Sequence, residues 1–336
     1  MGSSTNGIFS RRQVMQAGVA AGVALAARGS PAADAKAADA KTLPLILKTI
    51  PSTGEQLPAV GVGTNAFGFG SDAQMAELKQ VLQGLTDMGG KVVDTARVYG
   101  DSELVIGKLL AEIGNRDKVF LATKLPMGGG GFGGGGFRGF AGGGGGGDAK
   151  SVLDESFRRL QVSKLDLLQL HNVGGVREYL PAMQEYKQAG KIRYLGVTTS
   201  VDDQYGELID VLKNNKFDFV QVDYSIGNRD AAPQVLPFAQ DKGLAVLINQ
   251  PFGGRGKSYF GRLAGKPVPE WAAEFDATTW AQFMLKYIIS HPAVTAAIPG
   301  TTTMAYLQDN QAGGRGRLPT PAQRKKMEEY WDALPS

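Results

Sequence analysis

The sequence of 336 residues contains no cysteine and only two histidines, His171 and His291. The lack of cysteine excludes disulfides, thiolate metal ligands and a cysteine nucleophile. Neither histidine lies at a ligand-like spacing from carboxylates, so no zinc site is expected. The chain also has no apolar run long enough to span a membrane and no basic stripe interleaved with aromatic residues. We therefore expect neither a membrane span nor nucleic-acid binding.

The composition is otherwise that of an ordinary globular protein, with 43% hydrophobic residues, 20% charged residues and a formal net charge of +4. A chain of this length can bury a large core, either as two small domains or as one α/β barrel. We expect it to act as a monomer.

The first 40 residues differ from the rest. Arg11 and Arg12 precede a mildly apolar run, and Ala33-Asp34-Ala35 supplies a small-x-small cleavage site. This order is typical of a twin-arginine export signal, and it predicts a periplasmic protein that uses the twin-arginine translocation machinery. The alternative is a disordered, alanine-rich tail with a chance arginine pair. The expected divisions are a signal peptide at 1–35, a linker at 36–44 and a barrel at 45–336.

Short apolar runs alternate with amphipathic stretches after residue 44. Ile46 to Val60, interrupted at Pro51–Gly54, predicts a hairpin. Strands are expected near 59–64, 92–96, 119–124, 165–171, 193–198, 217–223, 244–250 and 294–298. Helices are expected at 72–88, 101–114, 149–161, 178–189, 203–214, 233–242, 278–290, 304–311 and 321–332. Eight successive βα units with apolar strands predict a (β/α)8 TIM barrel with an N-terminal β-hairpin and a C-terminal helix.

An open, doubly wound sheet is the alternative fold. Gly61-Val62-Gly63-Thr64-Asn65-Ala66 matches the G-x-G-x-x-A dinucleotide pattern after a strand. That fold also requires an acidic residue at a second strand end about 20 residues further on. No acidic residue ends a strand at that distance, so the barrel is preferred.

The segment 128–147 holds 15 of the 47 glycines. Regular structure there would carry a large entropic cost, so a long flexible loop is expected. It is either a substrate lid in which Phe132, Phe137 and Phe140 supply apolar contacts, or a passive insertion, because long loops cost little extra to close.

Four polar residues stand at or just beyond the ends of predicted strands. They are Asp94, Tyr99, Lys124 and His171. The carboxyl ends of barrel strands meet at one face, so a carboxylate, a phenol, an amine and an imidazole are expected together there. Taken singly, each of these residues would be interpreted as a solvated ion or as a polar group in the protein interior. All four on one face predict an acid–base site.

Five motifs contain or follow these residues. They are Asp94-Thr-Ala-Arg-Val-Tyr99-Gly100-Asp-Ser-Glu103-Leu-Val-Ile-Gly107, Ala122-Thr123-Lys124, Leu165-Asp166-Leu-Leu-Gln-Leu-His171-Asn172, Gly190-Lys191-Ile-Arg-Tyr-Leu-Gly196-Val197 and Ile298-Pro299-Gly300-Thr301. In this order, from about residue 45 to 315, the sequence resembles the aldo-keto reductases. The resemblance implies an enzyme that reduces an aldehyde or ketone to an alcohol with hydride from NADPH or NADH.

The resemblance also implies a role for each member of the quartet. No side chain can donate hydride, so a nicotinamide must supply it. Tyr99 would be the general acid, and the neighbouring Lys124 would lower the pKa of its phenol, which is ordinarily near 10. Asp94 would pair with Lys124 and orient it. A neutral His171 would hydrogen-bond the carbonyl oxygen and set its angle to the hydride.

The implied cofactor site is spread over several strand ends. Thr198, Thr199 and Gln221 would bind the carboxamide, and the amides of Thr301 and Thr302 would meet a phosphate at a helix start. The full expected set is Gly63, Thr64, Thr198, Thr199, Gln221, Asn249, Pro251, Gly253, Arg255, Gly300, Thr301, Thr302, Tyr306, Asp309 and Asn310.

Besides Thr198 and Thr199, which stand where the family uses serine and asparagine, three of these positions depart from the family pattern. Asn249 stands where a tyrosine usually stacks on the nicotinamide, Tyr306 where an arginine often covers the adenine, and Gly300 where lysine is frequent. The loss of cations weakens the expectation of a strict preference for NADPH over NADH. Arg255 and Lys257 either compensate at the pyrophosphate or form an exposed basic loop.

Other functions compete with reduction. An exported, non-catalytic barrel that binds a nicotinamide or another ligand is the main alternative, although a binding module needs no proton donor beside an amine. A cofactor-free hydrolase built on Asp94 and His171 would lack both a metal set and an activated nucleophile. His291, which precedes Pro292 and ends a helix, is expected to be structural.

Replacing Arg11 and Arg12 by lysine is expected to leave the precursor in the cytoplasm, because the export machinery recognises the arginine pair. Cell fractionation followed by immunoblotting of wild type and double variant measures this. Continued export of the variant would refute the targeting prediction.

Overall fold

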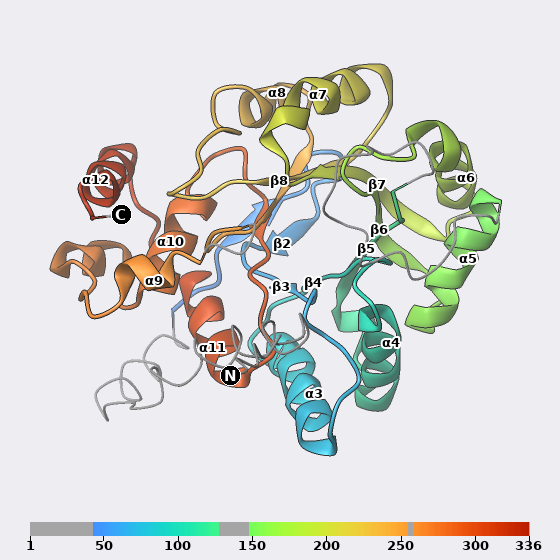
Figure 1. Ribbon diagram of the computed structural model, residues 1–336, viewed down its shortest axis with the longest axis horizontal. Coiled ribbons are helices and arrows are strands. Elements are labelled where there is room, and N and C mark those ends of the chain that lie inside the picture. Colours follow the sequence, from blue (N-terminus) through green and yellow to red (C-terminus); the bar gives the residue numbers. More distant parts are fainter. Residues whose placement is uncertain (1–42, 128–147, 255–257, 336) are drawn as a thin grey trace, which may run out of the picture. The chain divides into compact units, whose positions relative to one another are not determined.

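Eight parallel strands form one sheet in the computed structural model, which describes residues 43–127, 148–254 and 258–335. Each strand pairs with the next in the sequence, and the bridges Val60–Ala297 and Gly63–Gly300 join the first to the last. The sheet is therefore closed, which confirms the expected (β/α)8 barrel (Figure 1). The strands are β3 (Val62–Gly63), β4 (Val92–Asp94), β5 (Phe120–Lys124), β6 (Leu165–Leu170), β7 (Ile192–Thr199), β8 (Phe219–Asp223), β9 (Ala245–Asn249) and β10 (Ala296–Ala297).

Helices surround this barrel (Figure 1). Those expected from the sequence appear within a few residues of their predicted ends, as α3 (Asp72–Asp87), α4 (Ser102–Ile113), α5 (Ala149–Leu160), α6 (Val176–Gln188), α7 (Tyr205–Asn214), α8 (Val235–Asp241), α10 (Trp280–Ile289), α11 (Met304–Gly313) and α12 (Pro321–Asp332). The short α9 (Phe260–Leu263) and the 3-10 turns η1 (Arg116–Lys118), η2 (Asp202–Gln204) and η3 (Glu270–Phe275) were not expected, because they are too short to show a hydrophobic period. Of the described helices, none combines the length and apolar character needed to cross a membrane.

Three sequence predictions lie outside the described residues. They are the export signal and linker at 1–44, of which only residues 43 and 44 are described, the glycine-rich segment 128–147, and the basic pair Arg255 and Lys257. They stay predictions.

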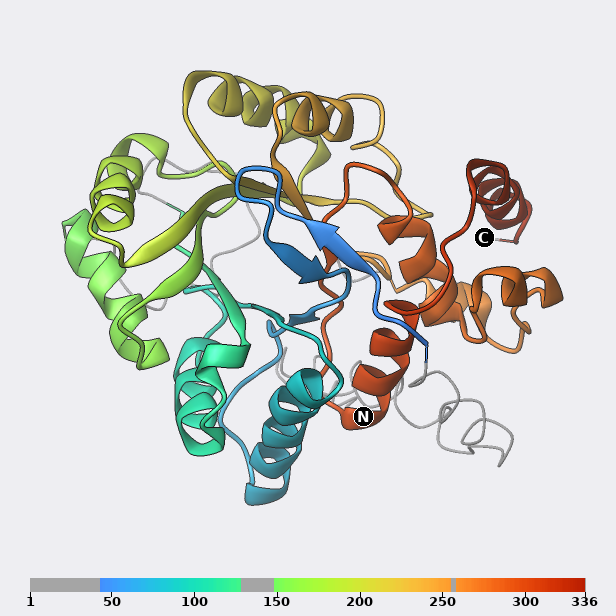
Figure 2. The same ribbon diagram turned by 180° about the vertical axis from the view of Figure 1, so that it is seen from behind.

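An antiparallel hairpin precedes the barrel, as the sequence predicted. In it β1 (Leu47–Thr49) pairs with β2 (Gln56–Pro58), and Gly54 takes a positive φ of 77° in the turn. Figure 2 shows the hairpin crossing one end of the barrel. Ile50 and Leu57 are fully buried against residues from the starts of the barrel strands. The hairpin therefore closes the N-terminal end and leaves the carboxyl ends of the strands at the other.

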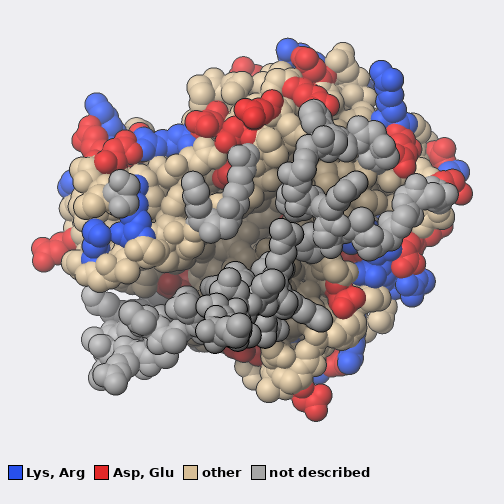
Figure 3. Space-filling view, viewed as in Figure 1, with Lys and Arg blue, Asp and Glu red and all other residues tan. Residues whose placement is uncertain are grey.

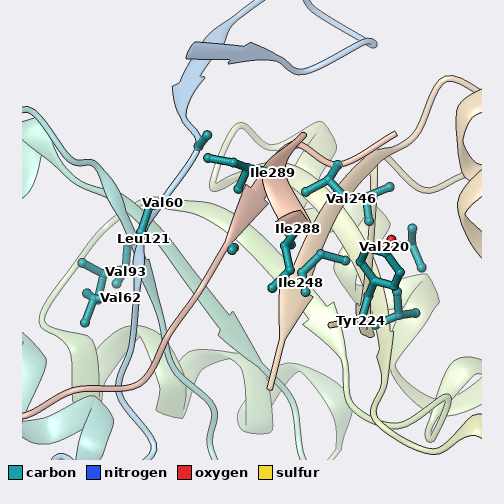
Figure 4. Close-up of a cluster of buried hydrophobic side chains, with 14 of the residues drawn as sticks. Val60, Val62, Val93, Leu121, Val220, Tyr224, Val246, Ile248, Ile288 and Ile289 are labelled. Atoms are coloured by element: carbon teal, nitrogen blue, oxygen red, sulfur yellow. The ribbon is translucent and has the colours of Figure 1, made fainter. Parts of the chain in front are cut away.

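Alternate residues of each strand point into the barrel and out toward the helices. The inner apolar cluster comprises, besides the hairpin residues, Val92, Phe120, Ala122, Leu167, Tyr194, Phe219, Ala245, Leu247, Ala296 and Ile298. Outward residues form a second buried cluster with the helices, as Figure 4 shows for Val62, Val93, Leu121, Val220, Val246 and Ile248. Because side chains alternate with a period of two, the inward-pointing residue that follows the apolar cluster on each strand lies at the carboxyl end of that strand.

His291 follows α10 and has a structural role, as expected. Its Nδ1 accepts a hydrogen bond from the Ala293 N–H at 3.2 Å, and its ring meets Tyr224 edge-on at 5.7 Å. Burial, assisted by Arg324 and Lys48, lowers the pKa of His291 to about 4. The imidazole is thus neutral at pH 7 and places no charge at the end of α10.

The variant His291→Asn retains an acceptor for the Ala293 N–H but removes the titrating ring. The unfolded chain binds this proton near pH 6.5 and the folded chain only near pH 4, so the stability from a neutral His291 is complete above 6.5 and is lost as pH falls toward 4. Between pH 7 and 4.5 we expect the variant to lose about 1–2 kcal/mol less unfolding free energy than wild type, a value discounted for the partly exposed ring. Urea denaturation at both pH values measures this, and identical losses would contradict it.

Candidate active site

Polar side chains occupy the inner positions at the carboxyl ends of the strands. They follow the inner apolar residues at intervals of two, and the register sets Lys124 beside Gln169, Thr198 beside Gln221, and Asp223 beside Asn249. Together they form a polar ring at the end of the barrel opposite the hairpin. Figure 3 shows that the surface at this end is hollowed near its centre.

Asp94 and Lys124 form a buried ion pair within this ring, as the sequence predicted. The Lys124 Nζ donates to Asp94 Oδ2 at 2.5 Å and to the Thr95 carbonyl at 2.8 Å. Neither side chain is more than 4% exposed. Burial alone would lower the pKa of Lys124, but the attraction of Asp94 and Tyr99 outweighs it and raises that pKa. Lys124 is therefore a permanent cation at neutral pH.

Tyr99 lies in the loop between β4 and α4, close to Lys124 and His171. Its ring centroid is 5.3 Å from Lys124 Nζ and 6.0 Å from the His171 ring, which it meets at 84°. Burial raises the pKa of the phenol; Lys124 opposes this rise and Asp94 adds to it. The sequence predicted that Lys124 would lower this pKa. The contribution of Lys124 has the predicted sign; burial is the larger effect, so the pKa of Tyr99 rises overall.

His171 directly follows β6 and is neutral, as expected. Burial, and then Lys124, lower the pKa of His171 to about 3. Its Nδ1 is buried and has no hydrogen-bond partner among the described residues. The site thus holds two protonatable groups without charge, Tyr99 and His171, beside one fixed cation.

Gln169 belongs to the site, although it was not among the residues predicted from the sequence. It is fully buried, and its Nε2 donates to Gln221 Oε1 at 2.9 Å and, more weakly, to Asp94 Oδ1 at 3.4 Å. A signal was present: Gln169 interrupts an apolar strand two residues before His171, so it shares the inner face. Asp223, the inner residue beside Asn249, was overlooked too.

The expected cofactor residues on the earlier strands divide into two groups. Thr198 and Gln221 lie in the polar ring, where the Thr198 hydroxyl accepts from the Asn172 N–H at 3.1 Å. The hydroxyl of Thr64 instead donates to the Asp94 carbonyl at 2.9 Å, and that of Thr199 to Gln204 Oε1 at 2.6 Å. These bonds link the loops at the strand ends, and a role for Thr64 or Thr199 at the cofactor stays a prediction.

The residues after β9 present unsatisfied acceptors. Asn249 Oδ1 and Gln250 Oε1 are buried without a partner in the described part of the chain, and Gln250 takes a positive φ of 51°. Pro251 is buried and Gly253 is partly exposed in the loop that follows. A ligand with N–H or O–H donors would satisfy these oxygens.

The residues after β10 lead into α11. Gly63 and Gly300 form a bridge in which a Cβ on Gly63 would lie 2.9 Å from the Ile298 carbonyl oxygen, so the backbones approach closely here. Thr301 and Thr302 precede the N-cap residue Thr303, whose side chain makes no capping hydrogen bond. Within the described ranges no side chain caps the first amides of α11, which suits a phosphate group.

The last three expected cofactor residues lie on α11 itself. Tyr306 is 47% exposed and Asn310 is buried. The Asp309 carboxylate accepts from Thr279 Oγ1 at 2.9 Å and from Gln282 Nε2 at 2.7 Å, so it joins α11 to the start of α10. A role for Asp309 in binding adenosine stays a prediction.

A nicotinamide dinucleotide fits this arrangement. The start of α11 offers amides for a phosphate, and unsatisfied buried acceptors follow β9 at the same carboxyl ends of the strands where Tyr99 and His171 lie. In the described ranges, no group of three or more histidine, aspartate or glutamate side chains is placed to hold a metal ion.

The sequence profile of the Aldo/keto reductase family matches residues 59–321, which is most of the chain. The chain belongs to the aldo/keto reductase family. This aldo/keto reductase is 32% identical over 249 residues to methylglyoxal reductase YeaE of Escherichia coli (strain K12), a match that covers 72% of this chain and 81% of the relative. It is 24% identical over 277 residues to probable aldo-keto reductase 1 of Glycine max, covering 72% and 75%. It is therefore an oxidoreductase.

Solved structures of aldo/keto reductases have the same fold. An enzyme from Klebsiella pneumoniae, in complex with NADP and acetate, superimposes with a TM-score of 0.67 at 24% identity over 86% of this chain and 96% of the other. The holo form of an aldo-keto reductase from Bacillus halodurans gives a TM-score of 0.64 at 22% identity, over 85% and 96%. These likenesses confirm the barrel.

The variant Lys124→Met leaves the Asp94 carboxylate buried without its cation. We expect the unfolding free energy to fall by about 3–5 kcal/mol. Adding Asp94→Asn removes the unpaired charge, so the double variant is expected to recover much of that loss. Urea denaturation of the three variants and wild type completes the double-mutant cycle, and strictly additive losses would contradict the pairing.

Proposed function

We propose that this aldo/keto reductase reduces a small aldehyde or ketone to an alcohol, with NADPH as hydride donor and Tyr99 as general acid. The observation that carries the proposal is the position of the Tyr99 ring, 5.3 Å from the Lys124 ammonium and 6.0 Å from the neutral His171 ring. Carbonyl reduction requires three kinds of side chain: a proton donor, a cation that stabilises the conjugate base of that donor, and a neutral hydrogen-bonding group.

The bound cofactor supplies the hydride; the side chains handle the proton. Neutral His171 hydrogen-bonds the carbonyl oxygen and fixes its direction. As negative charge develops on that oxygen, Tyr99 transfers its phenolic proton to it. Lys124 stabilises the resulting phenolate, and Asp94 holds Lys124 in place through the 2.5 Å contact. A raised pKa keeps Tyr99 protonated until that moment.

The proposal of NADPH is supported by two Klebsiella pneumoniae structures of this fold, one in complex with NADP and the other with NADPH. Within this chain it is supported by the uncapped start of α11, where Thr301 and Thr302 precede the helix. Gly300 and Tyr306 place no cation beside a 2′-phosphate, so we propose that NADH is also accepted.

Methylglyoxal is the substrate to test first, because the Escherichia coli relative named a methylglyoxal reductase is 32% identical. A small dicarbonyl needs little apolar surface. For the full precursor we propose export by the twin-arginine route, in which a folded protein carries its cofactor with it. Sustained turnover after export would then need a partner that regenerates the reduced cofactor.

The variant Tyr99→Phe is expected to reduce kcat with NADPH and methylglyoxal by at least about 100-fold, because it removes the proton donor and leaves the ring in place. NADPH binding, measured by fluorescence titration, is expected to be unchanged. Tyr194→Phe is the matched control: this tyrosine bonds Glu55 and Thr53 at the closed end of the barrel, so the variant is expected to keep full activity. Undiminished turnover by Tyr99→Phe would refute the assignment, and NADPH binding without turnover by wild type would favour the non-catalytic barrel.

A further inference from the structure

A second buried ion pair lies directly behind the Tyr99 loop. Glu103, in the first turn of α4, is fully buried. Its Oε1 accepts a hydrogen bond from the Thr123 hydroxyl at 2.8 Å, and its Oε2 accepts from Arg159 Nε at 3.0 Å. Thr123 is the residue before Lys124 on β5. One carboxylate therefore joins α4 to the strand that carries the catalytic lysine.

Arg159 extends this link to the loop itself. It comes from α5 and is 9% exposed, and its guanidinium also donates to the carbonyl oxygen of Gly100. Gly100 directly follows Tyr99 and has a positive φ of 57°. A series of contacts thus begins at Gly100, the neighbour of Tyr99. It continues through Arg159 and Glu103 to Thr123, the neighbour of Lys124.

Backbone hydrogen bonds alone do not hold Tyr99 to β5. The Thr95 N–H donates to the Ala122 carbonyl and the Arg97 N–H to the Lys124 carbonyl, both at 2.9 Å. From there the chain leaves the strand, and the Tyr99 N–H bonds only within its own turn, to Ala96 at 3.0 Å. After Arg97, the Tyr99 loop therefore contacts β5 through side chains and not through backbone hydrogen bonds.

Gly107 explains how Arg159 reaches this position. It lies four residues after Glu103, on the same face of α4. A Cβ at Gly107 would lie 2.5 Å from the Arg159 carbonyl oxygen and 2.7 Å from the Leu160 carbonyl carbon, so only glycine lets α5 approach so closely. The intervals of four residues between Tyr99, Glu103 and Gly107 are thus explained by this packing of α4 against α5.

Stability is a weak explanation for this pair. Burying two charges costs free energy that their attraction only partly offsets, and apolar replacements of equal volume are often as stable or more so. Burial raises the pKa of Glu103, whereas Thr123 and Arg159 act in the opposite direction. What the pair supplies is a defined geometry, because each of its contacts fixes a direction as well as a distance.

We propose that Glu103 and Arg159 are positioning residues that set the separation of Tyr99 from Lys124. This inference rests on the proposed function. The electrostatic effect of the ammonium on the phenol falls with distance, so a loop displaced from β5 would leave Tyr99 a weaker acid and its phenolate less stabilised. A displacement of about 1 Å in a catalytic group can cost about 100-fold in rate.

The test uses Glu103→Gln in the full-length protein. The amide keeps the Thr123 contact and the shape of the side chain, but it no longer attracts Arg159. The matched control is Asp166→Asn. Asp166 is also a buried carboxylate that accepts from two arginines, Arg116 at 2.9 Å and Arg193 at 2.8 Å, but it lies near the start of β6, at the end away from Tyr99.

Both variants are expected to unfold at lower urea concentration, so stability alone does not distinguish them. Only Glu103→Gln is expected to lower kcat with NADPH and methylglyoxal, by about 10-fold or more, with KM nearly unchanged. The alkaline limb of its kcat–pH profile is expected to move to higher pH, because Lys124 acts less on Tyr99. Arg159→Lys retains a cation and is expected to fall between Glu103→Gln and wild type. An unshifted profile and unchanged kcat in Glu103→Gln would overturn the inference.

A readout without turnover separates this inference from the proposed function. Hydrogen–deuterium exchange of peptides covering residues 97–101 is expected to accelerate in Glu103→Gln and to match wild type in Asp166→Asn. If wild type reduces no carbonyl compound, the proposed function fails while the exchange result still decides whether the pair holds the loop. Unchanged exchange in Glu103→Gln would show that it does not.

Discussion

The buried contact between Asp94 and Lys124 is the interaction on which the site depends. At 2.5 Å, with both side chains almost wholly removed from water, it keeps a lysine charged where burial alone would favour the neutral amine. That charge then acts on both neighbours, assisting burial in lowering the pKa of His171 and opposing burial at Tyr99. Loss of either partner would leave an uncompensated charge inside the barrel.

The barrel creates the conditions for this contact. The hairpin and the inner apolar cluster fill the N-terminal half, so polar side chains meet at the carboxyl ends of the strands. The register then decides which of them touch: Gln169 lies beside Lys124 and reaches Gln221, which makes it part of the site. Behind the ring, Glu103 and Arg159 connect α4 and α5 to the same strands. Asp94 thus keeps Lys124 charged and in place, while Arg159 and Glu103 link the Tyr99 loop to β5.

Much of the site was predictable because strand ends and motifs are local features. Asp94, Lys124 and His171 each end an apolar run, and Tyr99 lies a fixed five residues beyond Asp94. Gln169 was not predicted because leucines flank it in the strand, although its period of two with His171 is visible in the sequence. The hydroxyls of Thr64 and Thr199 bond neighbours that only the folded loops bring near, and the roles predicted for these residues at the cofactor stay predictions.

The sequence by itself determined the eight βα units, the hairpin, the four polar residues at one face and the resemblance that names the chemistry. Periodicity and motif spacing encode these, and both depend on near neighbours in the chain. Only the tertiary structure decided how deeply the polar side chains of the site are buried and how neighbouring strands are aligned. It also decided the close approach of α4 and α5 at Gly107. Those depend on residues far apart in sequence, and this is why burial raises the pKa of Tyr99 although Lys124 acts to lower it, as predicted.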